Sequence, residues 1–250
     1  MTESGECVDS SLERVRILRS ISSTEQKLNY YDTMATTYEK MVPDLDISLV
    51  DYKAPNMAAK TLDTVFPKDR QNVLVLDVAC GTGLVVEKPR TLLTQRWPHT
   101  SISIDPTVIN YRQSTDGSEG MLRVAESKGL YQSLQHHLIL PNVQLPLTSD
   151  TYDLVIVAGA LSNGHLSPYV LPELLRVAKP EAYLCLTAND DKGNNYTQEL
   201  LVYMEELENK GLWTKVVMQK VDQWQKRAPN NEGSLVYIPG IVVIYRKLSQ

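Results

Sequence analysis

The chain has 250 residues, of which 42% are apolar and 22% charged, so it is long and apolar enough to bury one hydrophobic core. Its formal net charge of −5 argues against a partner held mainly through phosphate groups, because such binding needs lysine and arginine patches. The longest apolar stretch, residues 154–161, is far shorter than the roughly 20 residues that cross a membrane. We therefore expect a soluble protein that binds neither nucleic acid nor a membrane.

The cysteines and the first residues indicate the cellular compartment. Cys7, Cys80 and Cys185 are odd in number and are not accompanied by a CxxC pair or a nearby histidine. We expect reduced thiols instead of disulfides or zinc ligands. Residues 1–6 lack the basic-then-apolar layout of a secretory signal. We expect a monomer in the cytoplasm, or also in the nucleus, without a metal site.

Helix and strand patterns alternate along a single domain at residues 26–250, which follows a polar extension at residues 1–25. Ser23 to Gln26 form a capping box that predicts a helix reaching Tyr38. Further helices are predicted at residues 57–66, 121–130, 171–178 and 196–211, and strands at residues 73–76, 154–157, 183–186, 215–221 and 235–245. Another strand is predicted to begin at His136.

This order of elements predicts the fold class. Strands that alternate with helices favour a mainly parallel α/β sheet covered on both faces, and the last two strands favour an antiparallel hairpin at its edge. Ligands of such sheets bind at the carboxyl ends of the strands. The site is therefore expected after residues 76, 157 and 186.

A glycine-containing turn follows the first buried strand. Asp77 is followed by Ala79, Gly81 and Gly83, and glycines at these positions let the backbone approach a ligand closely. A dinucleotide-binding turn would carry a third small residue three positions after Gly83, where this chain has Val86. Asp77 also suits a cationic ligand better than a diphosphate. S-adenosylmethionine (SAM), which has an ammonium group and no phosphate, fits this turn.

This turn and several other segments resemble the Rossmann-like, class I SAM-dependent methyltransferases, and one subgroup of them in particular. The segments are residues 30–38, 77–83, 116–122, 129–131, 152–162, 171–174 and 237–240. They extend the resemblance from about Gln26 to Lys247, nearly the whole chain. The resemblance implies a seven-stranded, mainly parallel sheet with an antiparallel C-terminal hairpin and helices on both faces. It also implies methyl transfer from SAM.

The resemblance assigns the glycine turn and the N-terminal helix to the cofactor. Gly81 and Gly83 would pass beneath the methionine and ribose parts of SAM, with Ala79 in the same turn. Asp77 would lie near or behind the amino group, or would instead orient backbone N–H groups. Tyr38 would belong to a helix that closes over the cofactor, unless its ring only packs within that helix.

Three further segments would complete the cofactor site. Met121 would pack beside the adenine, although a core role fits its spacing too, and Leu138 or Ile139 would line the other face. Gly159 and Ala160, followed by a leucine, would form the pocket floor near the sulfonium.

The resemblance weakens at residues 89–114. Pro89 falls inside an expected helix, where a proline costs about 3 kcal/mol. We interpret this stretch as an atypical insert or an altered segment that weakens the site. A second departure lies at residues 179–182, where Glu181 and its neighbours replace the family's Gly-Gly turn and make a positive φ harder to adopt.

Two carboxylates compete for the ribose. Asp105 ends the short strand-like run 102–104, whereas Asp116 is followed by Gly117 and has Met121 in the family's register. We favour Asp116.

The function predicted is methyl transfer from SAM to an unknown small-molecule or protein acceptor. A SAM-binding scaffold without turnover is the alternative, and a third hypothesis, an NAD-linked reductase, is opposed by Val86 and by the absence of a Tyr-x-x-x-Lys pair. The catalytic residues are not identified. Candidate acceptor-side residues in the loops are His165, Asn189, Asp190 and Tyr196.

Overall fold

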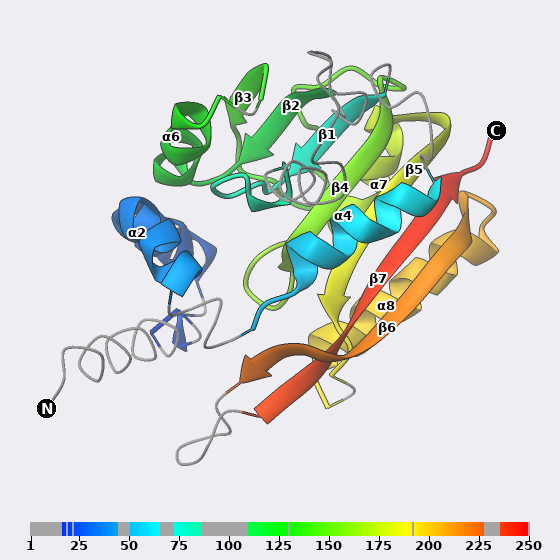
Figure 1. Cartoon of the computed structure of the whole chain (residues 1–250). Coiled ribbons are helices and arrows are strands. Elements are labelled where there is room, and N and C mark those ends of the chain that lie inside the picture. Colours follow the sequence, from blue (N-terminus) through cyan, green and yellow to red (C-terminus); the bar gives the residue numbers. More distant parts are fainter. Residues whose placement is uncertain are drawn as a thin grey trace, which may run out of the picture.

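The computed structural model describes residues 17–18, 20–21, 23–44, 51–65, 73–86, 110–129, 131–191, 193–227 and 236–249. Within them, seven strands form one sheet in the order β3-β2-β1-β4-β5-β7-β6 (Figure 1). The strands are β1 (Leu74–Val78), β2 (Asn110–Asp116), β3 (Ser133–His136), β4 (Tyr152–Leu161), β5 (Ala178–Asn189), β6 (Trp213–Arg227) and β7 (Val236–Lys247). The helices are α2 (Thr24–Asp44), α4 (Ala54–Val65), α6 (Glu119–Ser127), α7 (Leu171–Val177) and α8 (Asn195–Asn209), with a 3-10 turn η2 (Pro168–Val170).

The sheet is mainly parallel. Strands β3, β2, β1, β4 and β5 are parallel to one another, whereas β7 is antiparallel to both β5 and β6. The predicted α/β class with an antiparallel C-terminal pair is confirmed.

Both faces of the sheet are buried, in two separate hydrophobic cores. Leu76, Val155 and Leu184 belong to the core that includes α7 and α8, while Val75 and Ile156 belong to the core beneath α4. Figure 1 shows α4 crossing one face and α7 and α8 on the other. Because successive strand residues point to opposite faces, a strand covered on both faces carries an uninterrupted apolar run, as residues 154–157 of β4 do.

The strand order places the site. The neighbouring strands β1 and β4 are followed by connections that lead in opposite directions along the sheet, to β2 and to β5, and ligands bind in the crevice between such connections. The turn after β1, the end of β2 and the loop after β4 meet at this point.

Strands β2 and β3 differ from the sequence prediction. Strand β2 begins at Asn110, so residues 110–114 of the predicted insert belong to the sheet, while residues 89–109 lie outside the described residues. Strand β3 ends at His136 instead of beginning there. It pairs on one side with the polar strand β2 and lies at the sheet edge, which removes the need for an apolar run.

Two predicted helix ends are confirmed. The Ser23 side chain accepts the backbone N–H of Gln26 at 3.5 Å, as a helix N-cap does. Helix α8 is followed by Gly211 in the left-handed region, with φ of +70°, and its N–H donates to the carbonyl of Glu208 at 2.9 Å.

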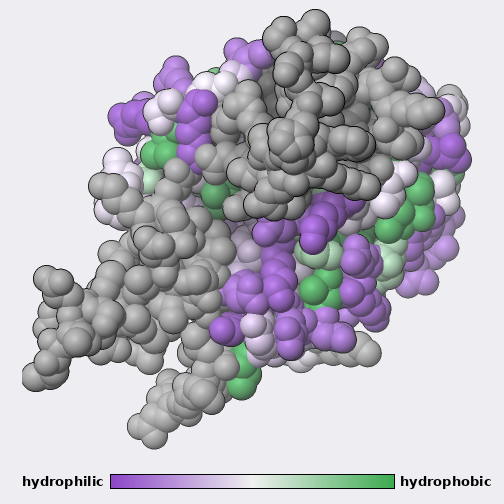
Figure 2. All heavy atoms as spheres, in the orientation of Figure 1, coloured by the Kyte–Doolittle hydropathy of each residue, from purple (hydrophilic) through white to green (hydrophobic). Residues whose placement is uncertain are grey.

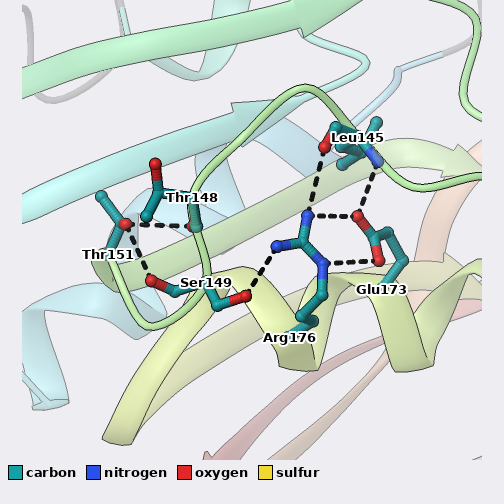
Figure 3. A network of polar contacts seen from close by, with 6 residues as sticks. All are labelled: Leu145, Thr148, Ser149, Thr151, Glu173 and Arg176. Atoms are coloured by element: carbon teal, nitrogen blue, oxygen red, sulfur yellow. Dashed lines mark hydrogen bonds and ion pairs between the residues drawn. The ribbon is translucent and has the colours of Figure 1, made fainter.

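A polar network fastens the loop between β3 and β4 to α7 (Figure 3). Glu173 accepts the backbone N–H of Leu145 at 2.7 Å and pairs with Arg176 at 2.6 Å. Arg176 also donates to the Leu145 carbonyl at 3.2 Å and to Ser149 Oγ at 2.8 Å. The loop that carries Leu138 is thus anchored at its far end.

On the face shown in Figure 2, the described apolar side chains lie in small groups. Hydrophilic side chains surround them in the view of Figure 2, and the exposed apolar residues include Val216 and Met218 on β6. None of the described helices is both long and apolar enough to span a membrane. Cys80 and Cys185 are buried free thiols, and Cys7 lies outside the described residues.

Candidate active site

The turn after β1 has an unusual backbone. Ala79, Gly81 and Gly83 have φ values of +54°, +56° and +86°. The Ala79 N–H donates to the carbonyl of Thr115 at 2.8 Å, which ties the turn to β2. A Cβ at Gly81 would meet nothing within 4 Å, so this part of the turn borders open space.

Asp116 ends β2 and faces this turn. Its carboxylate accepts the N–H of Gly81 at 2.9 Å on one oxygen and the N–H of Ser118 at 2.8 Å on the other. Burial raises the pKa of Asp116, and the two backbone N–H groups act in the opposite direction. Asp116 is 9% exposed, whereas Asp105 lies outside the described residues.

One pocket of about 1020 Å³, its open mouth included, brings together nine of the eleven predicted cofactor residues. They are Tyr38, Ala79, Gly81, Asp116, Gly117, Met121, Leu138, Gly159 and Ala160. Ile139, the alternative to Leu138, lines it too. Asp77 and Gly83 are not among the lining residues.

Asp77 is instead buried within the sheet, at 1% exposure. It accepts a hydrogen bond from the Tyr131 hydroxyl at 2.7 Å. Burial raises the pKa of Asp77 to about 7, the Tyr131 bond opposes the shift, and the charge of Asp116 adds to it.

Helix α2 covers the part of the pocket that contains Met121. Met121 is buried at 2% exposure in a cluster with Met34 and Ala35 of α2. A Cβ at Gly117 would lie 2.9 Å from Leu28 Cδ2, so the Leu28 side chain of α2 packs directly on this glycine. Asp32 of α2 accepts the Ser118 hydroxyl and the Gly120 N–H, both at 2.7 Å.

The loop after α2 supplies a residue that the sequence analysis missed. Tyr52 is packed so tightly against Gly159 that a Cβ there would lie 1.9 Å from the Tyr52 hydroxyl. Gly159 has φ of +85°, and its N–H donates to Thr187 Oγ1 at 2.9 Å. The floor of the pocket at the end of β4 is thus bordered by a phenol.

The loop after β4 joins α2 through polar side chains. Tyr31 Oη lies 2.8 Å from His165 Nε2, and Ser162 Oγ lies 2.9 Å from His165 Nδ1. Lys27 Nζ donates to the Asn163 carbonyl at 3.0 Å. Lys27, Tyr31 and His165 all line the same pocket.

With this geometry in view, the sequence can be compared with known proteins. The profile of the ubiE/COQ5 methyltransferase family matches residues 21–223. Human methyltransferase-like protein 27 is 35% identical over 211 residues, which cover 84% of this chain and 77% of the human protein. The chain belongs to the ubiE/COQ5 methyltransferase family. The subgroup that the sequence segments indicated is that of methyltransferase-like protein 27, and this prediction is confirmed.

Solved structures of SAM-dependent methyltransferases share the fold. One from Aquifex aeolicus has a TM-score of 0.50 at 21% identity and covers 84% of this chain and 97% of its own. Another, from Corynebacterium glutamicum, has a TM-score of 0.51 at 15% identity and covers 88% of this chain and 98% of its own. The Rossmann-like methyltransferase fold is therefore shown, and SAM is the cofactor of this family.

The pocket of this methyltransferase fits SAM by its donors and acceptors. Each oxygen of Asp116 accepts one backbone N–H and has a second lone pair for a ribose hydroxyl. The space beside Gly81 leaves room for a ligand against the backbone. Thr82 Oγ1 is buried, lines the pocket and has no hydrogen-bond partner among the described residues.

The four predicted acceptor-side residues do not lie together in the pocket. His165 lines the pocket, whereas Asn189, Asp190 and Tyr196 are held elsewhere. Asn189 accepts from Gln225, and Asp190 pairs with Lys220 at 3.6 Å. The Tyr196 hydroxyl donates to the Leu166 carbonyl at 2.6 Å. These three do not line the pocket, because Asn189 ends β5, Asp190 follows it and Tyr196 lies at the start of α8.

Lys27 and Tyr31 were not predicted as site residues. The sequence could have indicated them only through their position in the N-terminal helix that carries Tyr38. A helix expected to close over a cofactor should present one face to it, and residues on that face are then candidates. Lys27, Tyr31 and Tyr38 follow each other at intervals of four and seven residues, which is one helical face.

Proposed function

We propose that this chain is an active SAM-dependent methyltransferase whose acceptor is a small molecule. The observation that carries the proposal is the single pocket that unites the cofactor-side residues, from Asp116 to Gly159, with Lys27, Tyr31 and His165. A module that only bound SAM would need no titratable side chains at the far side of its cofactor pocket.

The cofactor would be held by residues from three strand ends. Asp116 would accept the ribose hydroxyls, Met121 and Leu138 would enclose the adenine, and the backbone at Gly81 would lie along the methionine part. SAM supplies a methyl group on a positively charged sulfur. Position and orientation of the acceptor against that group supply most of the rate, up to about 7–11 kcal/mol of the barrier in favourable cases.

The remaining predicted residues would act around this core. Gly159 and Ala160 would form the floor, and Tyr38 would close the pocket from α2. Asp77 would act indirectly, by holding Tyr131 and the buried end of β1, because it does not line the pocket.

The cover over the pocket favours a small acceptor. Helix α2 is fastened to the loop after β4 by Lys27 and Tyr31, and to the start of α6 by Asp32. A side chain on the surface of another protein would have to pass between this helix and the loop after β4 to enter the pocket. A small molecule can be enclosed beneath it.

Methyl-labelled SAM provides the test. The purified chain is incubated with labelled SAM and, separately, with a small-molecule extract and a protein extract. We expect label in small molecules, retained by the surface control Asp150→Ala and lost in Asp116→Ala. Cofactor binding without transfer to either extract would support the non-catalytic scaffold, and label confined to the protein extract would overturn the small-molecule acceptor.

A further inference from the structure

The described lining of the pocket includes one cation, one imidazole and three phenols, of which Tyr38 is one. Lys27, Tyr31, Tyr52 and His165 line it, and Asp116 is the acidic residue among the described lining residues. Both oxygens of Asp116 already accept backbone N–H groups, from Gly81 and Ser118. An acceptor that carried an ammonium group would face Lys27 without an available carboxylate, so this chemistry favours an oxygen acid.

Hydrogen bonds determine which way protons can move. Burial raises the pKa of Tyr31 well above its ordinary value, so its phenol keeps its proton and donates it to His165 Nε2 at 2.8 Å. We therefore assign the imidazole proton to Nδ1, which donates to Ser162 Oγ at 2.9 Å. The lone pairs of Tyr31 Oη remain able to accept a proton from a bound molecule.

The surroundings keep His165 neutral. Burial and the charge of Lys27 lower the pKa of His165 to about 4, and the backbone of Asn163 opposes the shift. Tyr31 and Lys27 of α2 are the titratable groups that face it, and Tyr31 in turn faces Tyr38, Tyr52 and Asp116. At physiological pH the imidazole is therefore neutral, and its Nε2 lone pair accepts the hydrogen bond of Tyr31.

We propose that the acceptor is a compact molecule with a weakly acidic hydroxyl, a phenol or an enol, and that Tyr31 is the catalytic residue that takes its proton and passes its own to His165. This inference rests on the proposed function and names its acceptor class. His165 acts through Tyr31 as the store of the proton.

The step balances in atoms and charge. The hydroxyl bond of the acceptor breaks, its proton moves to Tyr31 Oη, and the former Tyr31 proton moves to His165 Nε2, which leaves an imidazolium. The acceptor oxygen forms a bond to the methyl group, while the electron pair of the broken S–C bond stays on the sulfur of SAM. His165 then returns its proton to water.

Lys27 stabilises the negative charge that develops on the acceptor oxygen. Its ammonium group has three N–H donors, of which one is bound to the Asn163 carbonyl. Gly164, with φ of +74°, makes this placement possible, because a Cβ there would lie 2.3 Å from Lys27 Nζ. Such a fixed charge in a buried site is worth far more than in water.

The first experiment measures binding, independent of turnover. With S-adenosylhomocysteine bound, the absorbance of 4-nitrophenol reports its ionisation in the pocket as the pH is varied. We expect the bound phenol to have a pKa at least one unit below its value in water, and Lys27→Met to abolish that shift. Lys60→Met, on the exposed face of α4, is the matched control and should leave it unchanged.

The second experiment measures transfer to phenolic and amine acceptors. Tyr31→Phe and His165→Asn should each lower kcat for the phenol by about 100-fold with little change in KM, and Tyr169→Phe, on η2, should not. In the unaltered chain, kcat/KM should stay level down to about pH 5 and fall as the pH approaches the His165 value of about 4. His165→Asn should remove that fall.

The outcomes separate this inference from the proposed function. Retained S-adenosylhomocysteine affinity in Tyr31→Phe shows a folded cofactor site. If the chain binds that ligand but does not bind the phenol, or binds it without a shift of the phenol pKa, the acceptor assignment is wrong. It is also wrong if the chain methylates amines and Tyr31→Phe is fully active. In each case the methyltransferase function stands. Failure to bind S-adenosylhomocysteine contradicts the function itself.

Discussion

At the scale of single residues, Asp77 couples the stability of the fold to pH. It is buried and its pKa is raised from 3.8 to about 7. Between these two pH values the folded chain therefore keeps a proton that the unfolded chain has lost. The stabilisation is complete below the unfolded value and is lost as the pH rises to about 7, with a slope of at most about 1.4 kcal/mol per pH unit.

Asp77→Asn should remove this dependence. Asparagine keeps an oxygen that can accept from Tyr131 but has no proton to lose. We expect the free energy of unfolding of the variant, relative to that of the unaltered chain, to increase as the pH rises from 4.5 to 7.5. Urea denaturation at each pH measures this difference. Parallel curves for the two proteins would show that Asp77 ionises normally.

Glu181 stores backbone strain at the entry of β5. Its φ is +65°, the conformation that the absent Gly-Gly turn would have adopted freely. Its carboxylate contacts Arg246 at 3.2 Å and Ser249 at 3.0 Å, both exposed contacts of little energetic value. The left-handed conformation costs a residue with a Cβ about 1–2 kcal/mol.

Two substitutions separate the strain from the ion pair. Both Glu181→Ala and Glu181→Gly lose the carboxylate, but glycine alone relieves the strain. Glycine also gains entropy in the unfolded chain, so we expect the glycine variant to exceed the alanine variant in unfolding free energy by only about 0.5–1 kcal/mol. Equal thermal stability of the two would contradict the strain.

At the scale of elements, the contact between α2 and α6 holds α2 in place over the pocket. Asp32 satisfies the Gly120 N–H at the start of α6, and a Cβ at Gly120 would lie 2.9 Å from the backbone of Asp32. The helices therefore meet backbone to backbone. Loss of the carboxylate leaves helix donors unsatisfied, at a cost of about 1–3 kcal/mol.

Asp32→Ala should loosen α2 without unfolding the sheet. We expect faster amide hydrogen exchange in residues 24–38 and 118–121 and weaker S-adenosylhomocysteine binding, with exchange in β4 and β5 unchanged. Asp32→Asn keeps the accepting oxygen and should restore most of the protection. If the amide exchange rates of α2 are the same in the unaltered chain and in both variants, Asp32 does not hold the helix.

The central strands and the glycine turn could be predicted from the sequence because their signals are local. Residues 154–157 are apolar at every position, and Asp77 to Gly83 carry the turn. Strand β2 could not, since its buried Ser114 and Thr115 are polar and its pairing depends on β1 and β3. Nor could the meeting of Tyr31 with His165, which are 134 residues apart.

At the scale of the whole molecule, segments far apart in the sequence meet at one pocket at the carboxyl edge of the sheet. Strand β1 supplies the turn, β2 the carboxylate, β4 the floor and α2 the cover. The two hydrophobic cores hold the sheet that fixes these distances. The central claim is that this pocket binds SAM.

Calorimetric titration of the purified chain with S-adenosylhomocysteine tests that claim most directly. We predict saturable binding of one molecule per chain in the micromolar range, reduced at least tenfold, about 1.4 kcal/mol, in Asp116→Ala and unchanged in Asp150→Ala. A folded chain that gives no binding heat at millimolar ligand, or an Asp116→Ala variant that binds as tightly as the unaltered chain, would contradict the account.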